Sequence, residues 1–99
     1  EEQTDFSKAL AQADIIYMTR MQKERMHEGE YELVKSNYIL RLENLFLVQK
    51  HARILHPLPK IEEIELPLEV EQSDPRIAYF RQVENGLYIR MALISSLLE

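Results

Sequence analysis

A short apolar run that ends at two prolines is the stretch of this sequence best suited to chemistry. It reads Ile54-Leu55-His56-Pro57-Leu58-Pro59-Lys60 and indicates a buried strand that leads into a loop. Proline has no backbone N–H, and Pro59 disfavours a helical conformation at Leu58, so the loop offers carbonyl oxygens with few competing donors. Such a surface suits a ligand with an amide NH2 group, for example a carbamoyl group. An isolated Pro-x-Pro pair more commonly does no more than end a strand.

A second apolar run, Asp14–Met18, also leads into a polar loop, which carries Arg20 and Gln22 near its start. The two runs lie a few tens of residues apart, which is the separation of parallel strands joined by a crossover. Loops that follow parallel strands meet at one edge of the sheet, where the ligands of open α/β sheets bind. We therefore expect Arg20, Gln22 and the carbonyl groups of Pro57 and Leu58 to face one pocket.

Three blocks of the sequence carry more information together than separately: Tyr17-Met18-Thr19-Arg20-Met21-Gln22-Lys23-Glu24-Arg25, His56-Pro57-Leu58-Pro59, and Tyr79-Phe80-Arg81-Gln82 with Asn85-Gly86 and Arg90-Met91-Ala92-Leu93. These blocks resemble the catalytic chain of the aspartate carbamoyltransferase family, in the family's order and with comparable spacing. The resemblance runs nearly end to end. It covers only what in that family is the C-terminal part of the aspartate-binding domain.

The resemblance implies an α/β fold, the C-terminal part of a doubly wound parallel-sheet (Rossmann-like) domain with helices on both faces. Residues 1–99 would form one partial aspartate-binding domain. It would end in an interdomain helix over about residues 87–98, which in the family packs against the carbamoyl phosphate-binding domain.

The implied activity is transfer of the carbamoyl group of carbamoyl phosphate to L-aspartate in pyrimidine biosynthesis. The family implies a cytoplasmic enzyme without cofactors that works as a homotrimer of full-length chains. Its phosphate-gripping Ser-Thr-Arg-Thr segment, its second arginine for the substrate carboxylate, and the serine and lysine from a neighbouring subunit have no counterpart in these residues. We therefore expect the fragment alone to be inactive.

The resemblance also implies a role for each site residue. Arg20 would hold a carboxylate of aspartate in a bidentate pair, and Gln22 would donate a further hydrogen bond. The carbonyl groups of Pro57 and Leu58 would accept the carbamoyl NH2, and Pro59 would fix the loop through a cis Leu58–Pro59 bond. Catalysis would rest on orientation and electrostatics, with no nucleophile or general base in this fragment. The supporting residues would be Lys23, Glu24, Arg25 and His56.

Alternatives to this interpretation remain. From spacing alone, residues 20–25 are more commonly a solvated charged turn. Ornithine carbamoyltransferase shares the fold, but its loop reads His-Cys-Leu-Pro where this chain has Pro57, and Arg20 with Gln22 suits a dicarboxylate better than a cationic amino acid. A non-catalytic interaction module is the alternative outside the enzyme class. Two positions also depart from the family, because Lys60 replaces a usual arginine and Arg76 a common histidine.

Composition excludes several other functions. The 99 residues are 45% hydrophobic and 29% charged, with a net charge of −5, which is typical of a globular chain and not of a nucleic-acid-binding protein. The absence of cysteine excludes disulfides and thiolate chemistry. No apolar run approaches membrane-spanning length. The spacing of the three histidines does not indicate a metal site; they are His27, His51 and His56.

In the first half of the chain, we predict a helix capped by Thr4 and a strand over residues 14–18 covered on both faces. A long functional loop should follow over residues 20–38, with a helical turn at 30–35. A crossover helix is predicted over residues 41–50.

In the second half, residues 61–71 could form an edge strand, but Pro67 and the many glutamates favour an irregular surface connection. Nothing in the pattern indicates burial of Glu62 or Glu63, and we assign them no catalytic role. A helix should start at Ser73 or Asp74, followed by a break at Asn85-Gly86 and a second helix over residues 87–98.

Overall fold

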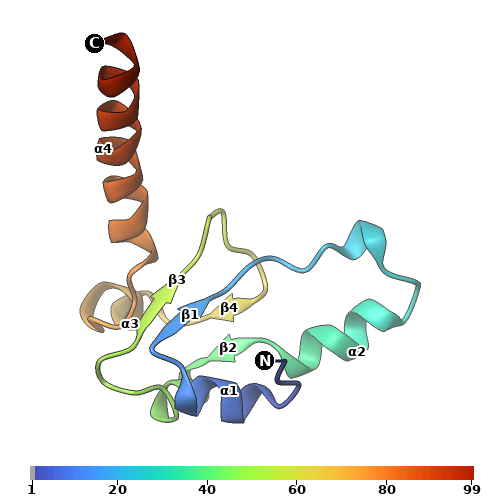
Figure 1. Ribbon diagram of the computed structural model, residues 1–99. Helices are drawn as coiled ribbons and strands as arrows, with labels where there is room; N and C mark the ends of the chain where they lie inside the picture. Colours follow the sequence, from blue (N-terminus) through green and yellow to red (C-terminus); the bar gives the residue numbers. More distant parts are fainter. Residues whose placement is uncertain (1) are drawn as a thin grey trace.

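The computed structural model describes residues 2–99, and it places them in a body of short helices and strands from which one long helix projects (Figure 1). This is a mixed α/β fold with small parallel sheets, as predicted at that level of detail. The elements are α1 (Phe6–Gln12), β1 (Ile15–Tyr17), the 3-10 helix η1 (Lys23–Arg25), α2 (Glu30–Asn37), β2 (Leu40–Arg41), the 3-10 helix η2 (Leu42–Phe46), β3 (Arg53–Leu55), β4 (Ile64–Glu65), α3 (Leu68–Ser73) and α4 (Tyr79–Leu98).

The strands form two parallel pairs. β1 pairs with β3, with Ile16 opposite Ile54, and Ile77 adds a parallel bridge to Ile54. β2 pairs with β4, with Leu40 opposite Ile64. The parallel β1–β3 pair confirms the crossover predicted between the two apolar runs. It brings the loops that follow both strands to one edge.

The core lies on one face of the β1–β3 pair. It consists of buried apolar side chains from the strands, the helices and the connections between them: Leu10, Ile16, Met18, Leu40, Leu45, Val48, Ala52, Ile54, Ile64, Ile77 and Tyr79. On the other face of β1, Ile15 and Tyr17 are 58% and 53% exposed. The prediction that this strand is covered on both faces is therefore wrong for the described part of the chain, which leaves that face open.

α1 begins one residue later than predicted. Its N-cap is Asp5, whose carboxylate accepts a hydrogen bond from the N–H of Lys8 at 3.1 Å, so the predicted cap at Thr4 is wrong. Carboxylates and hydroxyls are comparably good caps, and sequence alone does not choose between neighbours. From this start the helix directs Leu10 into the core, where it is buried.

The predicted crossover helix over residues 41–50 is also wrong. Leu40 and Arg41 form β2, and η2 follows. The N–H of Leu40 donates to the carbonyl of Glu63 at 2.9 Å, so strand pairing keeps this segment extended. The side chain of Asn44 then accepts the N–H of Arg41 at 2.7 Å, which starts a tight 3-10 turn.

Residues 61–71 are more regular than predicted. The irregular connection is wrong, because Ile64 and Glu65 form β4, and α3 begins three residues later. Pro67 is the N-cap of α3. A residue at this position donates no N–H hydrogen bond within the helix, so a proline fits there. Here pairing with β2 outweighs the weak strand preference of the glutamates.

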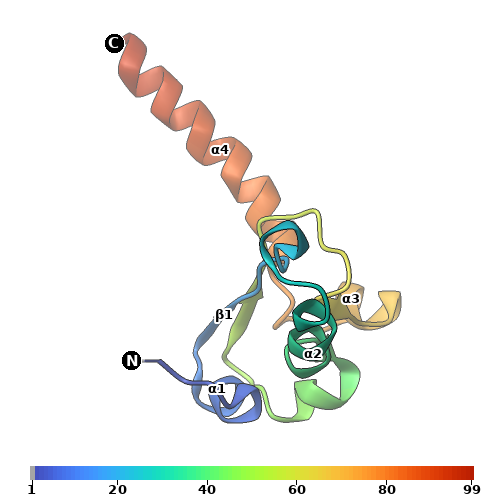
Figure 2. The ribbon, with the colours of Figure 1, turned by 90° about the vertical axis from the view of Figure 1, so that its right-hand side faces the viewer.

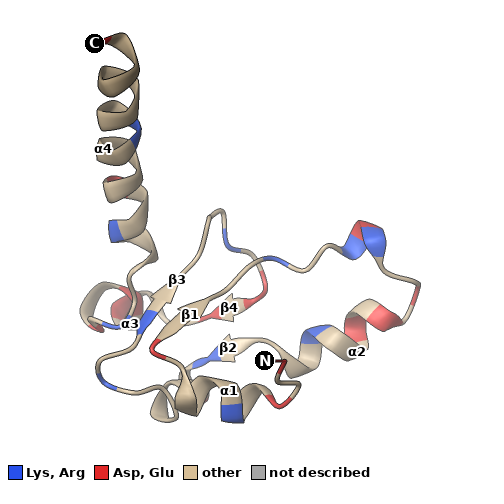
Figure 3. Ribbon diagram, in the orientation of Figure 1, with Lys and Arg blue, Asp and Glu red and all other residues tan. Residues whose placement is uncertain are grey.

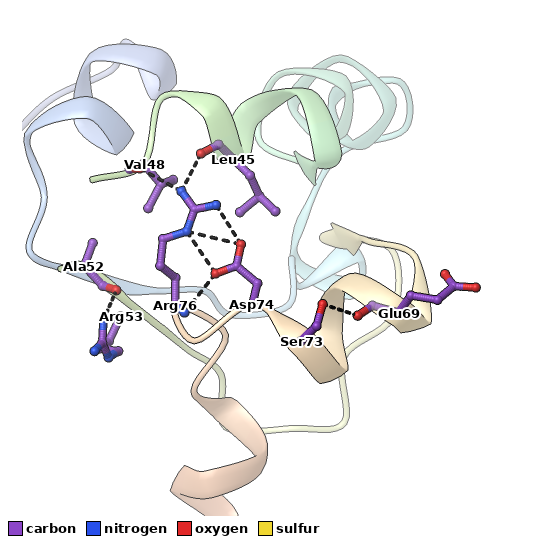
Figure 4. A network of polar contacts seen from close by, with 8 residues as sticks. All are labelled: Leu45, Val48, Ala52, Arg53, Glu69, Ser73, Asp74 and Arg76. Carbon is purple, nitrogen blue, oxygen red and sulfur yellow. Dashed lines mark hydrogen bonds and ion pairs between the residues drawn. The ribbon is translucent and has the colours of Figure 1, made fainter. Parts of the chain in front are cut away.

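Contrary to prediction, no helix starts at Ser73 or Asp74. Arg76 instead connects the segment between α3 and α4 to the rest of the fold. Its guanidinium pairs with Asp74 at 2.6 Å and donates to the carbonyls of Leu45 and Val48 at 2.6 and 2.8 Å (Figure 4). The several N–H groups of an arginine serve all three acceptors at once. The hydrogen bond from Arg76 lowers the pKa of the Asp74 carboxyl.

α4 runs without interruption through Asn85 and Gly86, so the predicted break there is wrong. A glycine in a helix interior costs about 1 kcal/mol, which is too little to end a long helix. Beyond its first turns α4 projects away from the body (Figure 2). No helix among residues 2–99 is long and apolar enough to cross a membrane. The helix nevertheless carries large apolar side chains that are at least half exposed: Val83, Leu87, Tyr88, Ile89, Met91, Leu93, Ile94, Leu97 and Leu98.

Candidate functional site

The loops that follow β1 and β3 meet in one cleft, which has a volume of about 630 Å³. The five residues predicted to bind substrate all line it, together with one supporting residue, His56. Their roles in binding stay predictions, but the predicted common pocket is present. The lining residues are Thr19, Arg20, Gln22, His56, Pro57, Leu58, Pro59 and Ile61.

The loop after β3 is held by hydrogen bonds to its backbone. The N–H of His56 donates to the side-chain oxygen of Gln82, in α4, at 2.9 Å. The N–H of Leu58 donates to Nδ1 of the His56 ring at 2.8 Å. The Leu58–Pro59 peptide bond is cis, as the resemblance predicts, and Leu58 has a φ of 55°. The loop is therefore fixed by residues of this chain.

His56 is itself held by a buried carboxylate. Its Nε2 lies 2.6 Å from Oε1 of Glu63, and both residues are almost completely buried. The same carboxylate oxygen accepts the N–H of Ile61 at 3.1 Å. The interpretation of Glu63 as an unburied surface carboxylate is therefore wrong.

A second buried carboxylate pairs with Lys60, the residue that directly follows this loop. Glu71, in α3, pairs with Nζ of Lys60 at 2.8 Å, and its side chain is only 5% exposed. The lysine that replaces the family's usual arginine thus still forms an ion pair. Nearby, the buried hydroxyl of Tyr79 makes no hydrogen bond within residues 2–99. Burial, and then the neighbouring Glu71, raises the pKa of Tyr79.

The loop after β1 has much weaker anchors. Arg20 forms an ion pair with Glu24 at 3.2 Å, and both side chains are more than half exposed. Arg25 makes no side-chain hydrogen bond or ion pair within residues 2–99 and does not line the cleft. Exposed pairs of this kind contribute about 0–1 kcal/mol. The guanidinium of Arg20 is therefore available to a ligand at little cost.

Charged residues are concentrated along η1 and α2, beyond the Arg20 loop (Figure 3). The hydroxyl of Tyr31 donates to Glu62 at 2.6 Å, and Lys35 pairs with the same carboxylate at 3.0 Å. Nζ of Lys23 lies 5.0 Å from the centre of the Tyr31 ring. The hydrogen bonds from Tyr31 and Lys35 lower the pKa of Glu62, while the bond to Glu62 raises the pKa of Tyr31. This cluster connects the helix α2 to the segment after the proline loop.

Sequence reasoning missed three residues that hold the site. The burial of Glu63 and Glu71 was not predicted, because many glutamates surround them in the sequence and neither β4 nor α3 was expected there. Gln82 lies within one of the recognised blocks, but no role was assigned to it. Its side chain bridges the N–H of His56 and the hydroxyl of Tyr17, which lies 3.2 Å from Nε2. A correct prediction of β4 would have pointed to Glu63. In the described part of the chain, no cluster of residues could hold a metal ion.

Comparison with known proteins agrees with this geometry. Residues 1–97 match the sequence model of the family described as aspartate/ornithine carbamoyltransferase, Asp/Orn binding domain. The chain belongs to this family. The resemblance to aspartate carbamoyltransferase is confirmed by relatives that carry this name.

Two curated relatives of the carbamoyltransferase family illustrate the similarity. The chloroplastic aspartate carbamoyltransferase 1 of Pisum sativum is 47% identical over 99% of this chain and 25% of its own length. The aspartate carbamoyltransferase catalytic subunit of Aliivibrio fischeri strain MJ11 is 46% identical over 91% of this chain and 28% of its own length. The chain thus spans about a quarter of the length of these relatives.

A solved carbamoyltransferase structure has the same fold. The aspartate transcarbamoylase of Trypanosoma cruzi, in complex with carbamoyl aspartate and phosphate, superposes with a TM-score of 0.76 and 33% identity. The similarity covers 89% of this chain and 27% of that chain.

Proposed function

We propose that the full-length protein containing this chain is an aspartate carbamoyltransferase, which transfers the carbamoyl group of carbamoyl phosphate to L-aspartate in pyrimidine biosynthesis. The observation that carries this proposal is the cleft, where Arg20 and Gln22 from one loop face Pro57, Leu58 and Pro59 from the other. One side of the cleft is lined by the guanidinium-bearing Arg20, and the other would offer the carbonyl oxygens of Pro57 and Leu58. A carboxylate and an NH2 group on adjoining substrates match these two sides.

The acceptor side depends on Arg20. A guanidinium can bind a carboxylate through two parallel hydrogen bonds, and this geometry is well matched to aspartate. Gln22 adds an amide that can donate to the same substrate. Ornithine would bring its cationic side chain toward Arg20, so aspartate is the proposed acceptor.

The carbamoyl side depends on the loop after β3. Pro57 and Leu58 present carbonyl oxygens that would accept hydrogen bonds from the carbamoyl NH2. In the reaction, the amine nitrogen of aspartate bonds to the carbamoyl carbon and loses a proton, while the bond to the phosphate oxygen breaks and phosphate leaves. The loops contribute orientation and electrostatic stabilisation, without a covalent intermediate.

The rest of the enzyme would complete the site and the fold. We propose that the complete domain is a doubly wound parallel sheet with helices on both faces, and that residues 87–98 pack against the carbamoyl phosphate-binding domain. The many apolar side chains exposed on α4 support such a packing partner. The working unit would be a homotrimer. A cytoplasmic location stays a prediction, since the pea relative is named as chloroplastic.

The test is an acceptor comparison with the purified full-length protein. Product formation from carbamoyl phosphate is measured with aspartate and with ornithine. The proposal expects carbamoyl aspartate as the main product. Faster carbamoylation of ornithine would contradict the choice of acceptor, and no transfer to either amine would favour the non-catalytic module.

A further inference from the structure

The loop from His56 to Pro59 presents no free backbone donor. Two of its four residues, Pro57 and Pro59, have no N–H. The N–H of His56 is occupied by Gln82 at 2.9 Å, and the N–H of Leu58 by Nδ1 of His56 at 2.8 Å. The backbone of this loop can therefore only accept hydrogen bonds from a ligand. The contacts of His56 show how this state is maintained.

The contacts of His56 determine which ring nitrogen carries the proton. Nδ1 accepts the N–H of Leu58, so it must have a free lone pair. The proton of the neutral ring then lies on Nε2 and is donated to Oε1 of Glu63 at 2.6 Å. A carboxylate facing Nε2 favours this tautomer, because a carboxylate can only accept. Glu63 thus keeps Nδ1 available to the loop.

Glu63 is in turn rigidly placed. Oε1 also accepts the N–H of Ile61 at 3.1 Å, and the carbonyl of Glu63 accepts the N–H of Leu40 at 2.9 Å. The residue directly precedes β4, whose pairing with β2 fixes its backbone. The chain of contacts therefore runs from the second sheet through Glu63 and His56 to the Leu58 N–H.

We propose that Glu63 is a positioning residue, which acts through His56 to keep the Pro57–Leu58 turn an acceptor-only surface selective for a ligand NH2 group. This inference rests on the proposed function and adds a source for its selectivity. Without Glu63, the His56 ring can turn or change tautomer, and the Leu58 N–H then loses its acceptor. The loop would then present a donor to the ligand beside its carbonyl acceptors. A site built to bind an NH2 group rejects an analogue that lacks one.

Two stable phosphonates test this selectivity without turnover. Phosphonoacetamide carries an NH2 group where acetonylphosphonate carries a methyl group, and the two are otherwise alike. Their dissociation constants are measured by calorimetry with the full-length protein. Wild type should bind phosphonoacetamide about tenfold more tightly or better, which corresponds to at least one hydrogen bond. Equal binding of the two ligands, or no binding of either, would overturn the proposal.

Variants of Glu63 then test whether this residue is the source of the selectivity for the NH2 group. Glu63→Leu should bring the ratio of the two dissociation constants close to one, mainly through weaker binding of phosphonoacetamide. Glu63→Gln keeps an oxygen that can accept from His56 and Ile61, so it should preserve the ratio. Glu69→Leu is the control: it makes the same charge change at an exposed position of α3 and leaves the Leu58 N–H occupied, so the ratio should stay at the wild-type value.

A second position makes the test independent of folding defects at Glu63. His56→Asn offers a side-chain oxygen that can still accept the Leu58 N–H, and it should retain more selectivity than His56→Phe. A ratio that stays at the wild-type value in both Glu63→Leu and His56→Phe would overturn the proposal. Equal loss of affinity for both phosphonates would also overturn it, because that result indicates general support of the fold. The carbamoyl transfer assay with wild type reports separately on the proposed function.

Discussion

The two loops that form the cleft differ in what holds them. The loop after β3 is anchored by His56, Glu63 and Glu71, all buried and all supplied by the same chain. The loop after β1 carries Arg20 on an ion pair with Glu24 that is open to solvent. The loop after β3 is thus preorganised for a ligand, whereas the loop after β1 is only weakly anchored.

This difference matches the groups that each loop would bind. Carbonyl oxygens are weak partners for an NH2 group unless they are fixed in direction, so a rigid loop is needed. A guanidinium can turn to meet a carboxylate and gains a charge-assisted pair when it does so. The cleft therefore combines the rigid backbone acceptors of the proline loop with the exposed cationic side chain of Arg20.

The largest expected effect is on the anchored loop. His56→Ala leaves the buried carboxylate of Glu63 without its hydrogen-bond donor, and we expect a loss of about 3 kcal/mol or more in the free energy of unfolding. Urea denaturation of the full-length protein measures it. Glu24→Gln, which removes an anchor of the other loop, should cost less than about 1 kcal/mol. Similar losses for both variants would contradict the contrast between the loops.

The same contrast can be probed with a double variant. His56→Ala combined with Glu63→Leu removes both members of the buried pair, so no unpaired charge remains. It should regain part of the stability lost in His56→Ala alone, because removing both partners is less costly than removing one. A double variant less stable than His56→Ala would show that the pair contributes mainly through packing.

Replacing Arg20 should weaken the binding of aspartate and leave the free energy of unfolding unchanged. In the full-length protein, Arg20→Ala would remove the proposed bidentate contact, which would contribute about 2–3 kcal/mol, so the KM for aspartate should rise roughly 30–150-fold. Binding of carbamoyl phosphate should be retained. Lys8→Ala, on α1, makes the same charge change away from the cleft and serves as the control. Normal saturation by aspartate would identify Arg20 as a solvated surface residue.

A smaller effect is expected at Gly29, which caps α2 beyond the Arg20 loop. Its φ is 91°, and a Cβ there would meet no atom within 4 Å. Gly29→Ala should therefore destabilise by about 1 kcal/mol through backbone conformation alone. Urea denaturation measures the change, with Glu28→Ala as the neighbouring control. No loss of stability would indicate that α2 can start elsewhere.

The smallest effect concerns the exposed cluster around Glu62. Its pKa is lowered from the ordinary value of 4.5, first by the hydrogen bond from Tyr31 and then by Lys35. A lowered pKa in the folded state means that the stabilisation is present above pH 4.5 and is lost as the pH falls through the folded pKa. Tyr31→Phe should raise the pKa of Glu62 toward 4.5, which an NMR titration of the carboxyl detects. An unchanged pKa would exclude Tyr31 as its main cause.

Local patterns in the sequence were enough to predict the two strands whose loops line the cleft. The two apolar runs gave β1 and β3, and the resemblance identified Arg20 and the proline loop, because these features depend on nearby residues. The errors fall where distant segments decide the structure. Residues 40–46 became a strand and a 3-10 helix because Leu40 pairs with the backbone of Glu63, which no local pattern reveals.

The same reason explains the missed anchors. Glu63 and Glu71 look like their exposed neighbours Glu62 and Glu69 in sequence, and only the pairing of β4 with β2 and the packing of α3 bury them. α4 shows the opposite case. Its break was predicted from Asn85-Gly86, but the strong helix formers on both sides outweigh one glycine.

A pair of crystal structures of the full-length protein tests the central claim most directly, one without ligand and one with carbamoyl phosphate and succinate as an unreactive acceptor. We expect the loop from His56 to Pro59 to be unchanged, with the carbamoyl NH2 within about 3.2 Å of the carbonyl oxygens of Pro57 and Leu58. Arg20 should have left Glu24 for a carboxylate of succinate. A proline loop that rearranges on binding, or an Arg20 that stays on Glu24, would contradict the account.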